Sequence, residues 1–177
     1  MVKSKVYKFD LTRLQMCDYT LTYDEFLLLT GSGKLTSLNL HEVSVKYHDG
    51  SLVPFDVICQ HKPNIKRIDI HSSSDGIFFE PDTTKKLVEI ISGYQKLSQF
   101  FIKGISDNFD IEAFVEYLTT NPQYYIVLEL FNTVSKDFKN KVREFWKRPR
   151  SSFNPTLRFR QDIDADKYDG FYDNLSF

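Results

Sequence analysis

The sequence predicts an α/β protein in which about five strand–helix units stack side by side, with a parallel sheet on one side and the helices on the other. Three observations support this prediction. A hexapeptide with apolar residues at its first, fourth and sixth positions recurs along the chain, a candidate helix follows most copies, and Gly, Pro or Asn residues separate the units. Because a single unit cannot bury its own apolar face, stacking of the units is what would let the chain fold.

The clearest hexapeptide supplies Leu35, Leu38 and Leu40 as its apolar residues. All copies are LTSLNL at 35–40, LTRLQM at 11–16, IKRIDI at 65–70, LSQFFI at 97–102 and, more loosely, YIVLEL at 125–130. This is the pattern of the strand half of a leucine-rich repeat, in which the chain returns by a helix. The unequal spacing favours a divergent array with insertions in its loops, and right-handed crossovers would make all strands parallel. The sequence therefore predicts a short leucine-rich-repeat-like solenoid.

The first two helices have recognisable ends. Thr22 is a good N-cap with Glu25 three residues later, which completes a capping box, and Gly31 or Gly33 could end this helix through a left-handed cap. The second helix is predicted over 54–64, because Pro54 suits a first turn and Pro63 stops a helix.

The remaining elements follow from apolar spacing. Alternating Val43, Val45 and Tyr47 before the pair Asp49-Gly50 predict a small hairpin outside the repeat. Three later helices are predicted at about 83–95, 110–120 and 135–148. The last of these would begin at Ser135, its inward residues would be Phe138, Val142, Phe145 and Trp146, and TLRFRQ at 156–161 would add an edge strand.

Length and composition predict one domain over 1–160 and an acidic, flexible tail over 161–177. The formal net charge of −1 excludes a global attraction for nucleic acid or acidic membrane. Cys17 and Cys59 have no metal-type spacing, so we expect two buried free thiols in a reducing compartment. No signal peptide is recognisable, and no window has the roughly 18 apolar residues of a membrane span. We therefore expect a cytoplasmic or nuclear protein.

Candidate chemical motifs are weak. The segment GSGK at 31–34 resembles a phosphate-binding loop, but Leu28 and Leu35 replace its first glycine and its final hydroxyl residue, so a helix end is favoured. The aspartate-rich segment 162–173 resembles a calcium loop, but lysine replaces its central glycine. We predict no catalytic residue, no cofactor and no metal, and hence a protein that is not an enzyme.

Two histidines occupy equivalent places in the repeat. His41 and His71 each directly follow the last inward residue of a hexapeptide, so they could be neighbours in space. We interpret them as equivalent surface positions, and a metal pair is the alternative.

The segment 136–160 is strongly basic, opposed only by Asp137 and Glu144, and its cations are Lys136, Lys139, Lys141, Arg143, Lys147, Arg148, Arg150, Arg158 and Arg160. A terminal helix with a solvated face is the favoured interpretation. Contact with nucleic acid or phosphate is the alternative function.

The residues between the inward positions of each hexapeptide should project from the open side of the sheet. We predict that this side binds a protein partner through Arg13, Gln15, Ser37, Asn39, Arg67, Asp69, Gln99, Phe101 and Glu129. Nucleic acid and membrane are not expected as partners, and the sequence leaves the identity of the partner and the oligomeric state open.

Residues 21–70 carry a resemblance to a known family. The pattern L-T-x-x-E-F-x-x-L before a glycine-bounded turn, then D-G-S-x-V and P-N-I before a strand, resembles the C-terminal part of nematode F-box-associated proteins. The resemblance extends through FDIEAFVEYLTTNPQYYIVLEL and the SKDFKNKVREF helix, and so covers most of the chain.

In that family an F-box docks on the adaptor of a cullin ligase, while divergent repeats recruit a target for ubiquitination. The resemblance therefore implies a recognition module similar to the target-binding half. Only ten residues precede the first hexapeptide, which is too short for an F-box, so no coupling to a ligase is carried over. Whether the chain is part of a longer F-box protein stays open.

Overall fold

The computed structural model describes residues 9–72, 79–120, 125–130, 134–147 and 157–160. Within them, strands form one sheet in the order β1-β2-β3-β4-β5-β6, and every neighbouring pair is parallel. The strands are β1 (Arg13–Thr22), β2 (Ser37–Lys46), β3 (Arg67–His71), β4 (Gln99–Ile105), β5 (Tyr125–Leu130) and β6 (Leu157–Arg160). The helices are α1 (Tyr23–Thr30), α2 (Phe55–Cys59), α3 (Thr83–Ser92), α4 (Ile111–Thr120) and α5 (Lys136–Lys147).

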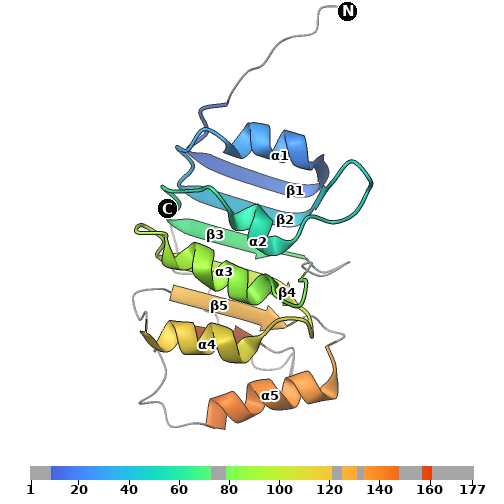
Figure 1. The fold of residues 1–177 in the computed structure, drawn as a ribbon, viewed down its shortest axis with the longest axis vertical. Coiled ribbons are helices and arrows are strands. Elements are labelled where there is room, and N and C mark those ends of the chain that lie inside the picture. The colour runs from blue at the N-terminus through green and yellow to red at the C-terminus, as the bar shows by residue number, and fades with distance from the viewer. Residues whose placement is uncertain (1–8, 73–78, 121–124, 131–133, 148–156, 161–177) are drawn as a thin grey trace, which may run out of the picture.

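The helices cover one face of the sheet, in the same order as the strands (Figure 1). Sequence neighbours are therefore spatial neighbours throughout the described chain, as alternation of strands and helices predicts. The prediction of an α/β protein with a parallel sheet and a layer of helices is confirmed, and so is the predicted edge strand, which is β6.

The pairing register brings the inward residues of successive strands to common levels. One level across the first five strands contains Leu14, Leu38, Ile68, Phe100 and Ile126, all buried, and the next contains Met16, Leu40, Ile70, Ile102 and Leu128. Of the second level only Met16, on the edge strand, is partly exposed. The core therefore lies between this side of the sheet and the helices.

The register corrects the alignment of the fifth hexapeptide. Ile126 pairs with Phe100, so YIVLEL aligns two residues out of step with the other copies. Tyr125, predicted to be the first inward residue, pairs with Gln99 and is only half-buried. Either Tyr125 or Ile126 could have been the first residue of this strand to face the core. Pairing with β4 places Ile126 there.

A bulge runs across several strands beyond the hexapeptides. Asp18 and Glu42 have φ values of 53° and 51°, and Gly104, at the corresponding place in β4, has a φ of 106°. A Cβ at Gly104 would lie 2.2 Å from the carbonyl oxygen of Ser72, so only glycine fits there. Beyond this bulge β1 and β2 stay paired as far as Thr22 and Lys46.

That pairing corrects the predicted hairpin. Val43 and Val45 belong to β2 and pair with β1, so they are part of the main sheet. The turn at Asp49-Gly50 does form. An antiparallel bridge joins the residues on its two sides, Lys46 and Leu52.

The helix ends agree with the sequence in part. Thr22 and Glu25 form the predicted capping box. Of the two glycines predicted for a left-handed end, Gly31, at the C-cap of α1, has a φ of −73°, whereas Gly33 has a φ of 70°. Helix α2 ends at Cys59, well before Pro63, and α3 ends at Ser92 before Gly93.

The last helix, α5, has its predicted cap, because the Oγ of Ser135 accepts a hydrogen bond from the backbone N–H of Phe138. Phe138 and Val142 are buried as predicted. The side chains of Phe145 and Trp146, and the predicted acidic tail at 161–177 with its calcium-like segment, lie outside the described residues.

A ring of five buried phenylalanines joins three successive units. Its contacts are Phe55–Phe79 (5.7 Å between ring centroids), Phe79–Phe109 (5.3 Å), Phe109–Phe114 (5.1 Å), Phe114–Phe100 (6.1 Å) and Phe100–Phe55 (6.2 Å). Each ring is at most 2% exposed. Tilted and edge-to-face pairs at these distances add to the stabilisation from burial.

The phenylalanine ring leads to a prediction about stability. We expect Phe100→Ala to lower the free energy of unfolding by about 3–5 kcal/mol, because it removes a ring that touches both α4 and the first residue of α2 and leaves a cavity. The matched control is Phe101→Ala, one residue along β4 on the opposite face, where the ring is half-exposed. Urea unfolding of both variants measures the difference. Equal losses would contradict a core centred on the phenylalanine ring.

Candidate functional site

The face of the sheet opposite the helices, called the open face here, carries the nine residues predicted to bind a partner. Because successive side chains of a strand point to opposite faces, the residues that alternate with the buried ones must project away from the helices. The burial patterns of β2, β3, β4 and β5 alternate in this way over the hexapeptides. The open face comprises Arg13, Gln15, Ser37, Asn39, Arg67, Asp69, Gln99, Phe101 and Glu129, together with Cys17, His41, His71, Lys103, Tyr125 and Val127.

Arg67 is the centre of the open face. Its Nη2 lies 2.7 Å from Oδ2 of Asp69, and its Nη1 donates a hydrogen bond of 3.0 Å to Oε1 of Gln99. Its Cζ lies 4.5 Å from the centroid of the Phe101 ring, in a cation–π contact. The Phe101 ring in turn packs edge-to-face on Tyr125, with centroids 5.6 Å apart. The guanidinium group is therefore held in place before any partner arrives.

The open face continues toward the carboxyl ends of the strands. Lys103 Nζ lies 2.8 Å from Oε1 of Glu129, and the rings of His41 and His71 meet edge-to-face with centroids 5.2 Å apart. The predicted proximity of the two histidines is confirmed. Burial lowers the pKa of His71, and the nearby Lys103 ammonium lowers it further.

The structure separates the nine predicted residues into groups. Arg67, Asp69, Gln99 and Phe101 are in mutual contact, whereas Arg13 and Gln15 lie on the exposed edge strand β1. Asn39 is notable because its buried Oδ1 has no hydrogen-bond partner.

Sequence reasoning did not assign Tyr125 and Lys103 to this surface. The predicted alignment of YIVLEL places Tyr125 among the inward residues. The predicted strand at 97–102 ends one residue before Lys103. The apolar alternation of Ile126 and Leu128 is the signal that could have placed Tyr125 correctly. Both residues are buried, and Tyr125 alternates with them, so it lies on the opposite face.

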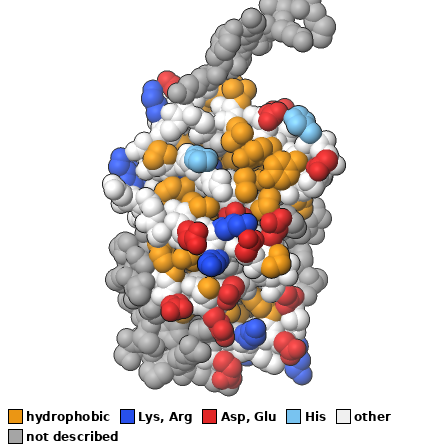
Figure 2. All heavy atoms as spheres, viewed as in Figure 1, with side chains coloured by type: hydrophobic (Ala, Val, Ile, Leu, Met, Phe, Trp, Pro, Cys, Tyr) orange, Lys and Arg blue, Asp and Glu red, His pale blue; other side chains and the backbone are white. Residues whose placement is uncertain are grey.

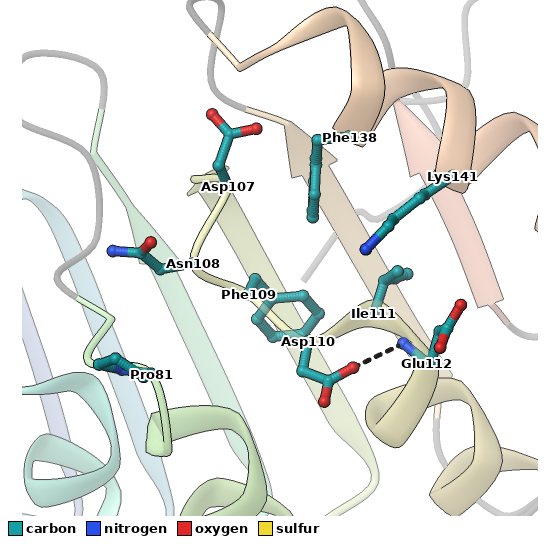
Figure 3. Close-up of a pocket in the computed structure, with 9 residues that line it drawn as sticks. All are labelled: Pro81, Asp107, Asn108, Phe109, Asp110, Ile111, Glu112, Phe138 and Lys141. Carbon is teal, nitrogen blue, oxygen red and sulfur yellow. Dashed lines mark hydrogen bonds between the residues drawn. The ribbon is translucent and has the colours of Figure 1, made fainter.

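A cavity of about 380 Å³ lies at the carboxyl end of the sheet, between the loop after β4 and helix α5 (Figure 3). Its lining residues are Pro81, Asp107, Asn108, Phe109, Asp110, Ile111, Glu112, Phe138 and Lys141. Two of its carboxylates hold helix ends. Asp107 accepts hydrogen bonds from the backbone N–H and the hydroxyl of Ser135, and Asp110 accepts from the N–H groups of Glu112 and Ala113. None of the lining residues that the structure describes is a histidine, cysteine or serine.

The helix-covered face differs in character from the open face. Figure 2 shows apolar side chains gathered over its upper half, around α1 and α2, and charged side chains over its lower half. Leu27 and Leu28 of α1 are exposed, and Tyr23 packs edge-to-face on Tyr47 with centroids 5.3 Å apart. On this face the cations and anions of α3 are mixed, as in the pair of Asp82 and Lys86 at 2.8 Å.

A buried lysine ends helix α2. Lys62 is 3% exposed, its Nζ donates hydrogen bonds to the carbonyl oxygens of Ile58 and Gln60, and it lies 5.0 Å from the centroid of the Phe26 ring. The ammonium thus satisfies carbonyl groups that the end of a short helix leaves unpaired. Burial lowers the pKa of Lys62 to about 8 and raises that of its neighbour, Cys59, to about 12. Cys59 is buried as predicted, but the prediction is wrong for Cys17, which is exposed on the edge strand β1.

In the part of the chain that the structure describes, no group of three or more His, Cys, Asp and Glu side chains is arranged to hold a metal ion. No helix there is long and apolar enough to cross a lipid bilayer.

The lowered pKa of Lys62 predicts how stability depends on pH. Between about pH 8 and 10.5 the unfolded chain binds the proton more tightly than the folded chain, so the contribution of Lys62 to stability rises with pH across this window. We expect the free energy of unfolding of the natural chain, relative to Lys62→Met, to gain about 3 kcal/mol from pH 8 to pH 10.5. Denaturant unfolding at several pH values measures this difference. A constant difference would contradict the lowered pKa.

Comparisons of this chain with protein-family models, with curated proteins and with solved structures found no match. The assignment of a function to this protein therefore rests on the contacts and charges of its own surfaces.

Proposed function

We propose that this protein is a non-enzymatic protein–protein interaction module, built as a leucine-rich-repeat-like stack, whose open face binds a partner protein. The observation that carries the proposal is the group of Arg67, Phe101 and Tyr125 at the centre of that face, with Asp69 and Gln99 bonded to the guanidinium. Arginine and aromatic side chains are the residues that most often dominate the energy of protein interfaces.

The repeat character is supported by contacts that recur from unit to unit at the amino ends of the strands. Lys34 Nζ lies 2.9 Å from Asp10 Oδ2, Asn64 donates to the carbonyl of Gly33, and Lys96 Nζ donates to Asn64 Oδ1. Asp10, Lys34, Asn64 and Lys96 each stand three residues before the start of a strand. Equivalent residues of four successive units thus form a polar ladder, as expected of stacked repeats.

The binding role is supported by the preorganised state of the open face. A side chain that is already held by two hydrogen bonds and a ring contact loses little conformational freedom when a partner binds. The half-exposed rings of Phe101 and Tyr125 offer apolar area, and the surrounding polar groups would form its rim. A partner that suits this face presents an apolar or aromatic centre with hydrogen-bonding groups around it.

The likeness to nematode F-box-associated proteins supports a recognition role similar to that of their target-binding half, in the cytoplasm or nucleus and without coupling to a ligase. A non-enzymatic role is supported by the cavity between β4 and α5, where Asp107 and Asp110 serve as helix caps.

The test is to exchange the charges of the central pair. Arg67→Asp combined with Asp69→Arg keeps an ion pair within β3 but exchanges the positions of its positive and negative charges. It also removes the cation–π contact of Arg67 with Phe101. We expect this variant to fold with nearly unchanged stability and to lose most of its partner in affinity purification with quantitative mass spectrometry. The matched control is Lys85→Glu, an exposed position on α3 on the helix-covered side. Unchanged recovery of partners by the exchanged variant would refute the proposal.

The alternative function, nucleic-acid contact through 136–160, is favoured by one observation. Lys136, Lys141 and Arg143 are exposed on α5, although Asp137 and Glu144 lie among them. Binding through such a helix should weaken steeply as salt rises, with a slope that falls by about one for each cation removed. A gel-shift titration of Lys141→Ala against the natural chain measures this. No shift at low salt would eliminate the alternative.

A further inference from the structure

The first unit of the stack, formed by β1 and α1, leaves apolar side chains exposed at one end of the molecule (Figure 1). In the described chain, the exposed large apolar side chains all belong to this unit, and they are Tyr19 (54%), Leu27 (42%) and Leu28 (37%). Met16, an inward residue of β1, is also only partly buried. Repeat stacks need a polar outer face on their terminal units to remain soluble. This end of the stack is therefore suited to contact with another protein surface.

Strand β1 has a long free edge. It contains ten residues and, among the described residues, pairs on one side only, with β2. The carbonyl oxygen of Thr12 accepts hydrogen bonds from the chain entering β2, so alternation directs the backbone groups of Arg13 and Gln15 to the free edge. Lysine and proline, which often protect such an edge from pairing, do not occur in this strand. The edge is therefore a template for another strand.

The bulge at Asp18 sets the orientation of the second half of β1. The carbonyl oxygen of Val45 accepts a hydrogen bond from the N–H of Val53, so Val45 directs its backbone groups away from β1. Its register partner, Leu21, therefore directs its own backbone groups toward β2. It follows that the backbone groups of Thr20 point to the free edge.

Two copies of β1 match each other in one antiparallel register. Even-numbered residues face the core before the bulge, as Leu14 does, and odd-numbered residues face it after the bulge, as Leu21 does. An antiparallel pair centred between residues 17 and 18 therefore places Leu14 of one copy opposite Leu21 of the other. It also places Met16 opposite Tyr19, on the same helix-covered side. Apolar side chains thus meet apolar side chains on both sides of the bulge.

The backbone groups and the charges fit the same register. Gln15 lies opposite Thr20 of the second copy, and the two residues can exchange backbone hydrogen bonds. The N–H of Thr22 is already bonded to Oε2 of Glu25 at 2.8 Å, so the pairing ends there. Arg13 is exposed and lies opposite Thr22, beside the carboxylate of Glu25. Antiparallel pairing thus brings a cation at the amino end of β1 against the acidic first turn of α1.

We propose that a second copy of this chain covers this end of the stack. The two β1 strands pair antiparallel about a two-fold axis that passes between residues 17 and 18, and they join the two sheets into one. Both α1 helices lie on the same side of the joined sheet. A two-fold interface is closed, so the assembly stops at two copies. The inference does not depend on partner binding, since it uses none of the residues of the Arg67 group.

Sedimentation equilibrium of the full chain over a wide range of concentrations is the first test. We expect a reversible equilibrium between monomer and dimer. Tyr19→Lys should weaken dimerisation by about tenfold or more, because two ammonium groups replace the rings that meet Met16 across the interface. Thr20→Pro should weaken it to a similar degree, because each copy loses an N–H on the free edge and none that bonds to β2.

The matched control is Tyr125→Lys, the same exchange at a half-exposed tyrosine on β5. It should leave dimerisation unchanged. The Arg67 and Asp69 exchange should also leave it unchanged, so failure of the dimer and failure of the partner surface can be told apart. Because Tyr19 is exposed in the single chain, Tyr19→Lys keeps the fold and decides the question even where Thr20→Pro does not fold.

Two further measurements test the register. Cys17 is exposed, and the two-fold axis places the Cα atoms of the two copies about 6 Å apart on one face, within the range of a disulfide. Diamide, which takes up the two thiol hydrogens, should therefore link the copies. Cys17→Ser should abolish the link, whereas Cys59→Ala, in the core, should not. Asp18→Asn retains a residue that tolerates positive φ and removes two like charges beside the axis, so it should tighten dimerisation several-fold.

Three results would contradict this dimer. A chain that stays monomeric at the highest concentration would overturn the proposal and leave the free edge to residues 1–8 or to a different protein. A dimer whose affinity is unchanged in both Tyr19→Lys and Thr20→Pro would have its interface elsewhere. A dimer that both variants weaken, but that diamide does not link through Cys17, would overturn the register.

Discussion

The side-by-side packing of inward residues at common levels is the constraint on which the rest of this structure depends. The closed ring of five phenylalanines shows its strength, because residues from three successive units contact one another within one buried cluster. If one unit slipped by one residue, its apolar side chains would turn to the solvent and its polar ones to the core. The register is therefore tightly specified wherever the helices cover the sheet.

That constraint also sets the geometry of the open face. Parallel strands in fixed register repeat at about 4.8 Å, so side chains at one level of neighbouring strands are brought into direct contact. Arg67 meets Gln99, Lys103 meets Glu129 and His41 meets His71 for this single reason. The surface that we propose for partner binding is therefore a consequence of the core on the other side of the sheet.

Several polar side chains of the described chain complete helix ends. Lys62 closes α2, Asp107 holds the start of α5 through Ser135, and Asp110 caps α4. Short helices need such partners because their unpaired backbone groups are a large share of the total.

The sequence by itself determined the fold class, the order of the elements, and which residues of the first four hexapeptides face the core. These follow from local periodicity, as at Leu38 and Leu40, and from local caps such as Thr22 with Glu25. Tertiary structure alone decided the alignment of the fifth strand, the extension of β2 beyond the bulge, the early end of α2 at Cys59, and the contacts of Arg67 and of the two histidines. A periodic pattern states which way a side chain points, but its neighbour across the sheet depends on how two separate strands dock, and that is settled by packing between units distant in the chain.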